Sequence, residues 1–389
     1  MHIDIPQVLA WLIAAAWTFR IAEGTRGLPT IPDLLLPQHD LTPTVSVTVI
    51  VPARNEQAEI GNCLQSLLDQ DYPHLQIVAV DDRSTDQTGA IMDSLGGSRL
   101  RILHITELPP EWLGKTHAMA VAARDVTSDF ILFTDGDILF RPDAIRRALA
   151  NAVATEADHF VLVPTTIIRR WDEAALLAFF QIFGLWAARP WKVADPRAQQ
   201  DAIGIGAFNL LRRTAYEQIG TFAALRMEIV EDLALARRVK RAGLRQRIAF
   251  GRGMVNVHWA AGVPGLINVM TKNIFSAFHY NPLLLLIGCS WLTVFCVAPF
   301  FAWVVPTLTL PALITMAAIA GGYRLMSRPS GLSPWNALLA PAAAATFIFA
   351  LLRSMVTTLR QGGVIWRGTF YPLAALRRNT APLFPRSTP

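Results

Sequence analysis

Two aspartates separated by one glycine follow an apolar stretch in the middle of the chain. Asp135, Gly136 and Asp137 come directly after FILFT (130–134). Two carboxylates this close repel each other unless a cation lies between them. A hard divalent ion shared with a nucleotide diphosphate would satisfy both, and Gly136 permits a turn that lets both side chains face one cleft. A solvated loop with two acidic residues is the alternative interpretation.

Further acidic residues stand where neighbouring predicted strands end. Asp82 ends one apolar run, and Glu56 lies just beyond Pro52 and Ala53, which end the first apolar run. Strand-end carboxylates can accept hydrogen bonds from a ribose hydroxyl or a base N–H. The alternatives are structural, because Asp82 could cap the next helix and Glu56 could simply occupy a first helical turn.

Lys115 and the pair Glu231-Asp232 each stand at a predicted helix start. A lysine at a helix N-terminus suits a phosphate, although a solvated surface lysine is the simpler interpretation of this residue alone. A carboxylate at Asp232 could take the proton from an attacking hydroxyl group. Acidic residues in a first turn also interact favourably with the helix dipole, which is the structural alternative.

Short apolar stretches alternate with helical patterns, and this alternation predicts how the chain positions those side chains. The predicted strands are 45–53, 76–82, 101–105, 130–137 and 159–166, and the predicted helices are 56–70, 87–95, 115–126 and 142–153. Such alternation is typical of βαβ units with a parallel sheet. In these sheets ligands bind beyond the carboxyl ends of the strands, which is where the acidic residues stand.

An apolar run near the N-terminus is long enough for about one bilayer crossing. It covers residues 5–22, with Asp4 before it and Arg20 and Arg26 late in it or after it. A cleaved signal peptide would instead begin with basic residues. The asymmetry predicts an uncleaved anchor with the N-terminus outside and the following domain in the cytoplasm. A helix that dips into the membrane without crossing it is the alternative.

The C-terminal part of the chain is also apolar. Residues 264–281 have an amphipathic pattern, which predicts an interfacial helix or a core helix of the globular domain. Three apolar stretches follow at 282–305, 307–322 and 335–357, and the middle one is short for a span. Three crossings would place the basic tail outside, against the positive-inside rule, so one stretch is open to a re-entrant or interfacial interpretation.

Charge is divided sharply along the chain. Residues 1–232 hold all 29 Asp and Glu residues with 19 Lys and Arg, whereas residues 233–389 hold 16 Lys and Arg and no acidic residue. The basic part is also the apolar part, which indicates the inner face of a membrane rather than nucleic acid as a partner. Three cysteines without a Cys/His cluster exclude a disulfide framework and indicate no zinc site.

The order of the acidic motifs resembles that of the family 2 glycosyltransferases, over about residues 45–258. Four motifs carry this order: VPARNE (51–56), VDDRSTDQT (80–88), TDGD (134–137) and ED (231–232). The layout is further similar to membrane-bound glycosyltransferases associated with hopanoid biosynthesis and their carotenoid- and ceramide-glycosylating relatives. That similarity rests on three segments: PPEWLGK (109–115), GLSP (331–334) and GGVIWRGTFY (362–371).

The resemblance implies an α/β fold of the GT-A type, with a mostly parallel sheet and with N-terminal and C-terminal transmembrane helices. The expected parts are an anchor (1–26), a linker (27–43), the catalytic domain (44–262), an interfacial helix (263–281), transmembrane segments (282–358) and a basic tail (359–389). The implied location is a bacterial-type inner membrane, crossed several times, with the catalytic domain on the cytoplasmic side.

The resemblance also implies a role for each matching residue. The donor nucleotide sugar would be held by Pro52, Ala53, Glu56, Asp82, Lys115 and Asp135, and Mg²⁺ or Mn²⁺ by Asp137. Asp232, beside Glu231, would be the general base of an inverting single displacement. The acceptor side would comprise Gly206, Ala207, Phe208 and Asn209, together with Trp366 and Arg367 of the tail.

The implied reaction moves a sugar from a nucleotide donor, uridine diphosphate by default, to a hydroxyl of a membrane lipid. Polysaccharide-elongating and ceramide-type relatives carry an Arg-Trp pair after the ED helix, whereas this chain reads VHWAA at 257–261. A polysaccharide-elongating enzyme and a catalytically silent membrane scaffold with the same fold remain the alternatives. No nucleic-acid-binding motif is present.

Overall fold

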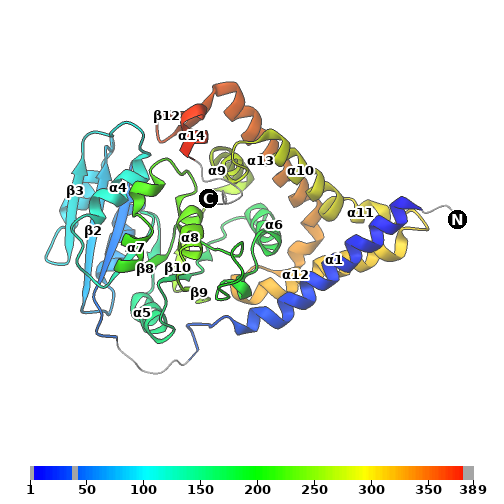
Figure 1. Ribbon diagram of the computed structural model, residues 1–389, viewed down its shortest axis with the longest axis horizontal. Helices are drawn as coiled ribbons and strands as arrows, with labels where there is room; N and C mark the ends of the chain where they lie inside the picture. The colour runs from blue at the N-terminus through cyan, green and yellow to red at the C-terminus, as the bar shows by residue number, and fades with distance from the viewer. Residues whose placement is uncertain (1–3, 37–42, 380–389) are drawn as a thin grey trace, which may run out of the picture. The chain divides into compact units, whose positions relative to one another are not determined.

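The computed structural model describes residues 4–36 and 43–379, which form two compact units (Figure 1). The α/β unit contains Ile31–Ile167, Lys192–His258 and the residues from Ala374 onward. The helical unit contains the residues up to Thr30, then Ile168–Trp191 and Trp259–Leu373. Parts of the predicted anchor (1–3), linker (37–42) and tail (380–389) lie outside the described residues.

The α/β unit is built on a seven-stranded sheet with the strand order β3-β2-β1-β4-β8-β6-β9. Its strands are β1 (Val47–Ala53), β2 (Leu75–Asp82), β3 (Leu100–Ile105), β4 (Phe130–Phe133), β6 (His159–Leu162), β8 (Asn209–Arg212) and β9 (Gln246–Ala249). All neighbouring pairs are parallel except those of β8, which runs antiparallel to β4 and to β6. The prediction of a mostly parallel α/β sheet is therefore confirmed.

Strand β1 lies in the middle of this sheet because both of its faces are apolar. All seven of its residues are buried. Val47, Val49 and Val51 contribute to the core on one face, and Ile50 contributes to the core on the other. Each fully buried aliphatic side chain of this size stabilises the fold by about 1.5–3 kcal/mol.

Helices cover both faces of the sheet. They are α2 (Ile60–Leu68), α3 (Thr88–Leu95), α4 (Gly114–Ala123), α5 (Ala144–Ala154), α7 (Arg213–Gln218), the short 3₁₀ helix η3 (Phe222–Leu225) and α8 (Glu231–Arg241). Residues of α2 and α5 pack in the first core, and residues of α4 and α8 pack in the second. The helices after β1, β2, β3 and β4 thus follow the predicted alternation, with shorter bounds.

Two predicted strands end earlier than expected. The strand predicted over 130–137 is β4, which stops at Phe133 and leaves Asp135–Asp137 in a loop. The strand predicted over 159–166 is interrupted after Leu162. Its last part belongs to a three-stranded sheet of β5 (Leu139–Phe140), β10 (Val255–Val257) and β7 (Thr165–Thr166).

Part of the predicted linker packs against the α/β unit. The backbone N–H of Leu34 donates to the carbonyl of Phe250 at 2.8 Å, and the Leu34 side chain is fully buried. Pro32 accepts from the N–H of Phe250. The segment from Pro32 to Leu34 therefore packs against Phe250 rather than forming a free connection.

The helical unit consists mainly of apolar helices, most of them long. They are α1 (Ile5–Gly27), α6 (Trp171–Ala187), α9 (Gly262–Ala277), α10 (Pro282–Leu292), α11 (Pro299–Ala302), α12 (Thr309–Ser330) and α13 (Ala340–Gln361). Shorter elements are η1 (Leu28–Thr30), η2 (Pro190–Lys192, at the boundary of the units), the π-helical turn η4 (Thr293–Val297), η5 (Pro334–Leu339) and the hairpin β11 (Gly363–Trp366) and β12 (Thr369–Pro372). Helix α14 (Leu373–Asn379) starts at the last residue of the helical unit.

Three described helical segments are long and apolar enough to cross a membrane: Ile5–Thr30, Thr309–Ser330 and Pro334–Gln361. The stretch predicted over 307–322 was expected to be short, but α12 has 22 residues. The stretch predicted over 282–305 is instead interrupted by a π-helical turn before Pro299. It qualifies only together with α9, from which α10 is bent by 117°.

Helices α1 and α12 pack side by side and run in the same direction (Figure 1). Ile21 lies against Gly322, and a side-chain atom at Gly24 would lie 2.9 Å from Leu325. The contacting residue on α12 moves from Gly322 to Leu325 as the residue on α1 moves from Ile21 to Gly24, so the two helices are parallel. Small residues allow this close approach of two helices.

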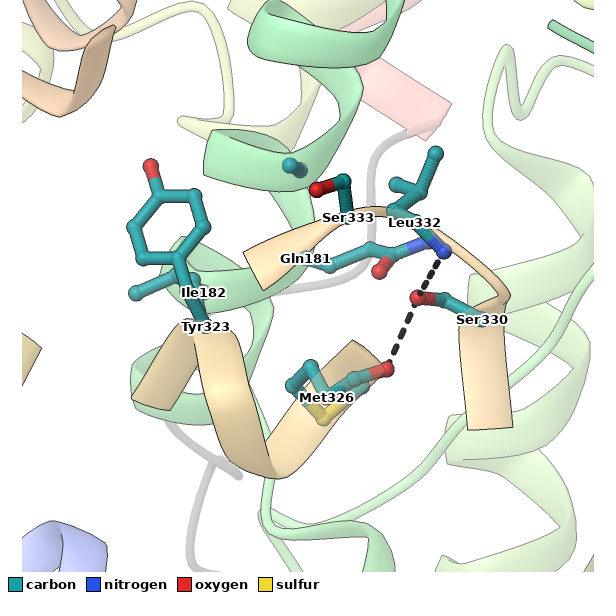
Figure 2. A pocket seen from close by; sticks show the side chains of 8 residues that line it. Gln181, Ile182, Tyr323, Met326, Ser330, Leu332 and Ser333 are labelled. Carbon is teal, nitrogen blue, oxygen red and sulfur yellow. Dashed lines mark hydrogen bonds between the residues drawn. The ribbon is translucent and has the colours of Figure 1, made fainter. Parts of the chain in front are cut away.

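A small pocket opens in the helical unit (Figure 2). Its lining comes from α6, α12 and the loop after α12: Ala178, Gln181, Ile182, Tyr323, Met326, Ser330, Leu332 and Ser333. The Ser330 hydroxyl donates to the carbonyl of Met326 at 2.7 Å and accepts from the N–H of Leu332 at 3.2 Å. No acidic or basic side chain lines this pocket, so it is distinct from the acidic residues singled out in the sequence.

Candidate active site

Lys115 joins two acidic residues that are far apart in the sequence. Its Nζ atom contacts Oδ1 of Asp135 and lies 2.6 Å from Oε1 of Glu231. The lysine is in the first turn of α4, Asp135 follows β4, and Glu231 begins α8. Burial would lower the pKa of Lys115, but the two carboxylates raise it above its usual value. The ammonium group therefore stays charged and holds three elements together.

Asp82 lies next to the start of α4. It is 4% exposed, and the Arg83 guanidinium binds both of its carboxylate oxygens, at 2.7 and 2.9 Å. Arg83 has a left-handed backbone, with φ of 58°. A side chain at Gly114 would collide with Oδ2 of Asp82. The glycine before Lys115 thus leaves room for the paired carboxylate.

Glu56, Asp135 and Asp137 bring three negative charges near one another. Burial, together with the charges of Asp135 and Glu56, raises the pKa of Asp137 to about 7, although Lys115 opposes the shift. Gly136 does not adopt the left-handed backbone that a turn glycine supplies; a side chain there would instead press at 3.3 Å on Ala53 and on Ile60. The glycine is needed for close packing against the end of β1.

Asp232 is held by the loop that precedes β8. The backbone N–H of Gly206 donates to Oδ2 of Asp232 at 2.9 Å, and the N–H of Leu233 donates to Oδ1 at 2.7 Å. A methyl group at Gly206 would lie 2.7 Å from Oδ2 of Asp135 and 3.4 Å from Nζ of Lys115. Gly206 therefore lies between the acid after β4 and the acid on α8.

The surroundings of Asp232 disfavour its ionised form. Burial and the adjacent Glu231 charge raise the pKa of Asp232 to about 7, while Lys115 acts in the opposite direction. A carboxylate that gains and loses its proton near neutral pH is suited to general base catalysis. The predicted donor-side and catalytic carboxylates are thus linked: Asp82 lies against Gly114, beside Lys115, and Gly206 lies between Asp135 and Asp232, while Asp137 feels the charge of Asp135.

Comparison with known protein families identifies the kind of domain that holds these residues. Residues 48–233 match the sequence model described as glycosyl transferase family 2. The α/β unit carries a family 2 glycosyltransferase domain. The match includes β1, β2, the Asp135–Asp137 loop and the first turn of α8, so it spans the acidic site described above.

Curated relatives of the glycosyltransferase domain carry the name 4,4'-diaponeurosporenoate glycosyltransferase. Those of Staphylococcus aureus strains MRSA252 and USA300 are each 29% identical over 197 residues. The alignments cover 49% of this chain and 50% of the relatives. The chain therefore matches about half the length of these curated relatives.

A solved structure with the same fold is that of the mannosyltransferase PcManGT from Pyrobaculum calidifontis, determined in complex with GDP-Man and Mn²⁺. The TM-score is 0.51 with 19% sequence identity, and the superposition covers 91% of this chain and 99% of the other. At this identity the likeness shows the fold, which is the GT-A fold expected from the sequence.

The predicted acceptor segment of the glycosyltransferase domain is mostly buried. Of its four residues only Gly206 reaches the site. Ala207 and Phe208 are buried in the hydrophobic core, and Asn209 is 3% exposed and bonded to His159. The acceptor-side role of this segment stays a prediction.

Trp366 and Arg367 belong to the hairpin of the helical unit. Trp366 ends β11, with Nζ of Lys272 lying 5.9 Å from its ring centroid. Arg367 and Gly368 form the turn, with φ of 49° and 77°. The acceptor-side role of these two residues stays a prediction.

The negative charge around Asp137 would favour a divalent cation, although the described side chains do not form a complete set of metal ligands. Within residues 4–36 and 43–379, no group of three or more His, Cys, Asp or Glu side chains is placed to hold a metal ion. Burial and the neighbouring carboxylates raise the pKa of Asp137, and a cation would relieve the repulsion between these carboxylates. Asp137 would supply one oxygen ligand, so further ligands would have to come from elsewhere.

Two features of the site were not predicted. Arg83 pairs with Asp82, and the buried residues His159 and Gln246 support the loop before Gly206. The sequence offered one signal, namely polar residues within otherwise apolar strands.

Proposed function

We propose that the protein is an inverting, metal-dependent glycosyltransferase that moves a sugar from a nucleotide-sugar donor, a uridine diphosphate sugar by default, to a hydroxyl of a membrane lipid. The observation that carries this proposal is the ion-pair link from Asp135 through Lys115 to Glu231, with Asp232 adjacent. It joins a donor-side acid at a strand end to a carboxylate suited to general base catalysis.

The donor would lie along the carboxyl ends of β1, β2 and β4, where ligands bind in sheets of this kind. Asp82 and Glu56 would accept hydrogen bonds from the nucleoside, beside Pro52 and Ala53. Lys115 would lie near the phosphates, and Asp135 near the sugar or ribose. The nucleotide sugar and Mn²⁺ named for the Pyrobaculum mannosyltransferase agree with this class of donor.

Asp232 would act as the general base in a single displacement. The acceptor hydroxyl loses its proton to the Asp232 carboxylate while its oxygen forms a bond to the anomeric carbon. The bond from that carbon to the diphosphate breaks at the same time, and the nucleoside diphosphate leaves with the bonding electrons. A positioned base of this kind contributes about 10²–10⁴-fold to the rate.

Charge on the leaving diphosphate must be stabilised. The Lys115 ammonium lies beside the donor-side acid Asp135, and it is already held by Asp135 and Glu231. A divalent ion on Asp137, Mg²⁺ or Mn²⁺, would supply further neutralisation of the leaving phosphates. The raised pKa of Asp137 means that binding of the cation would compete with a proton.

A lipid acceptor agrees with the long apolar helices of the chain and with the carotenoid-type name of the curated relatives. Large apolar side chains of α1, among them Val8, Leu12 and Phe19, are exposed, which suits contact with lipid. A site tethered to a bilayer would meet an acceptor that is confined to the same membrane.

The direction of the helices supports a defined topology. Parallel α1 and α12 would both cross from outside to inside, so the chain must return once between them. The broken segment α10–η4–α11 would make that return. Helix α13 contacts α9 through Ser354, which donates to the carbonyl of Thr271 at 2.6 Å, and would lie along α9 at the cytoplasmic face.

This topology would keep the C-terminal arginines inside, as the positive-inside rule requires. It resolves the conflict that three C-terminal crossings would create. The location proposed is the inner membrane of a bacterial-type cell, with the glycosyltransferase domain facing the cytoplasm.

The proposed function is tested with the full chain purified in detergent or lipid nanodiscs. Labelled nucleotide sugars are supplied with Mg²⁺ or Mn²⁺ and a membrane lipid extract, and label in the organic phase is identified by mass spectrometry. We expect label in a lipid product. Label in a water-soluble polymer would instead indicate polysaccharide elongation, and neither turnover nor nucleotide binding with any donor would indicate a silent scaffold.

A further inference from the structure

Three polar side chains lie side by side inside the apolar core of the α/β unit. His159, Asn209 and Gln246 are 0%, 3% and 1% exposed, and they stand on the adjacent strands β6, β8 and β9. Burying such groups costs free energy unless each is hydrogen-bonded. Aliphatic residues would fill the same places without that cost, so the polar residues call for a reason.

The hydrogen bonds among the three side chains can form in only one pattern. The amide nitrogen of Gln246 is a donor, so Nδ1 of His159 must accept from it, at 2.9 Å. Nε2 of His159 therefore carries the proton and donates to Oδ1 of Asn209 at 3.1 Å. Burial lowers the pKa of His159 to about 4, which keeps the ring neutral and preserves this pattern at neutral pH.

Both ends of this network bind one loop. The Asn209 amide donates to the carbonyl of Ile205 at 2.7 Å, and the Gln246 amide donates to the carbonyl of Ile203 at 2.6 Å. The Gln246 side-chain oxygen also accepts from the N–H of Ile203, at 3.4 Å. The network therefore fixes the carbonyls of Ile203 and Ile205. These residues belong to a segment that has no regular secondary structure.

The same loop holds the catalytic carboxylate. Gly206, directly after Ile205, donates its N–H to Asp232 at 2.9 Å. A side chain at Gly204 would collide with the backbone of Asp232. The loop thus contacts Asp232 on one side and the buried network on the other.

We propose that His159, Asn209 and Gln246 are positioning residues, which fix the 203–206 loop so that Gly206 holds the Asp232 carboxylate toward the acceptor hydroxyl. The proposal rests on the proposed role of Asp232 as general base. None of the three touches the donor or the reacting atoms; they act through the loop.

Gln246→Leu tests this role, because leucine keeps the volume and removes both bonds to Ile203. Gln70→Leu is the matched control. Gln70 is also buried, at 3% exposure, and donates to the carbonyls of Ser66 and Arg141 while accepting from the N–H of Ile145. Both variants lose a buried glutamine that bonds to the backbone, but only Gln246 supports the loop beside Asp232.

The first readout is amide hydrogen exchange of the peptide that contains residues 203–206, which needs no activity. We expect faster exchange in Gln246→Leu and no change in Gln70→Leu. Unchanged exchange in Gln246→Leu would overturn the proposal even if the enzyme is fully active. Faster exchange in an enzyme whose Asp232→Asn variant turns over normally would instead overturn the proposed role of Asp232.

The second readout separates turnover from donor binding. We expect kcat of Gln246→Leu to fall about tenfold or more, since small misplacement of a catalytic group is costly, with the Kd of the nucleotide changed less than threefold. Gln70→Leu should keep its kcat at an equal folded fraction. Equal losses of kcat in the two variants, or a parallel loss of nucleotide binding in Gln246→Leu, would contradict positioning.

His159→Gln is a second variant, which keeps the test usable if His159→Leu does not fold. His159→Gln can still donate to Asn209 and accept from Gln246, whereas His159→Leu can do neither. We expect His159→Gln to keep most of the turnover that His159→Leu loses. Equal turnover of the two variants would show that hydrogen bonding at this position is irrelevant.

Discussion

The backbone N–H of Gly206 donates to Oδ2 of Asp232 at 2.9 Å, while the α-carbon of the same glycine faces Asp135 and Lys115. One residue without a side chain thus separates the proposed base from the donor-side acid. Asp135 and Asp232 can lie this close to Gly206 only because residue 206 has no methyl group.

Gly206→Ala should therefore impair turnover without unfolding the protein. The new methyl group would lie 2.7 Å from Asp135, which is closer than non-bonded atoms tolerate, so the loop or the carboxylate must move. We expect kcat to fall by about tenfold to a hundredfold. Gly97→Ala is the control, because no atom lies within 4 Å of a side chain at Gly97; equal activity of both variants would argue against a crowded site.

Lys115→Met should weaken donor binding and lower stability. Removal of the ammonium group leaves Asp135 and Glu231 without their shared cation, and unpaired carboxylates in a partly buried site are costly. We expect nucleotide affinity to fall at least tenfold, as measured by calorimetry. Lys192→Met removes a surface lysine that lies 3.8 Å from Asp195 and should leave affinity unchanged.

The pH dependence of transfer should follow the raised pKa values of Asp137 and Asp232, both about 7. The base must be ionised, so the rate at saturating donor should rise with pH and level off above about pH 7. A rate that is flat between pH 5.5 and pH 8 would contradict a base with this pKa.

Stability should change with pH in the opposite direction. The folded state keeps protons on these carboxyls up to about pH 7, whereas the unfolded chain loses them near pH 4. The contribution of these two carboxyls to stability therefore falls as pH rises from about 4 to 7. His159, whose pKa burial lowers to about 4, opposes this change, but two carboxyls outweigh one imidazole. We expect the wild-type Tm to fall over this range and the Tm of Asp232→Asn to fall less, as measured by scanning fluorimetry.

The topology can be tested with single cysteines. Thr307 lies between α11 and α12, and Gln361 ends α13. A membrane-impermeant thiol reagent added to intact cells should label Thr307→Cys. It should label Gln361→Cys only after the membrane is opened. Labelling of Gln361→Cys in intact cells would show that α13 crosses the membrane.

The sequence predicted the strands and helices that carry the acidic residues, because their patterns are local. Five stretches of apolar residues became strands β1, β2, β3, β4 and β6, and the helices between them start near the expected positions. The order of the acidic residues along the chain then placed them at one edge of the sheet. A parallel sheet makes this step possible, since the carboxyl ends of its strands meet there.

What the sequence did not predict depends on contacts between distant segments. Strand β8 has four residues and enters antiparallel between β4 and β6, and it was not among the predicted strands. The bonds of His159 join residues 50 and 87 positions apart. No local pattern reports such a network, and the pairing of Lys115 with both Asp135 and Glu231 has the same origin.

The exchange Asp232→Asn tests the central claim most directly, because it removes the proton acceptor and keeps the size of the side chain. The measurement is sugar transfer to lipid by the purified variant, alongside its nucleotide affinity and with wild type as reference. We predict nucleotide affinity within about threefold of wild type and transfer reduced by at least a hundredfold. Transfer at the wild-type rate would contradict the assignment of Asp232 as the base.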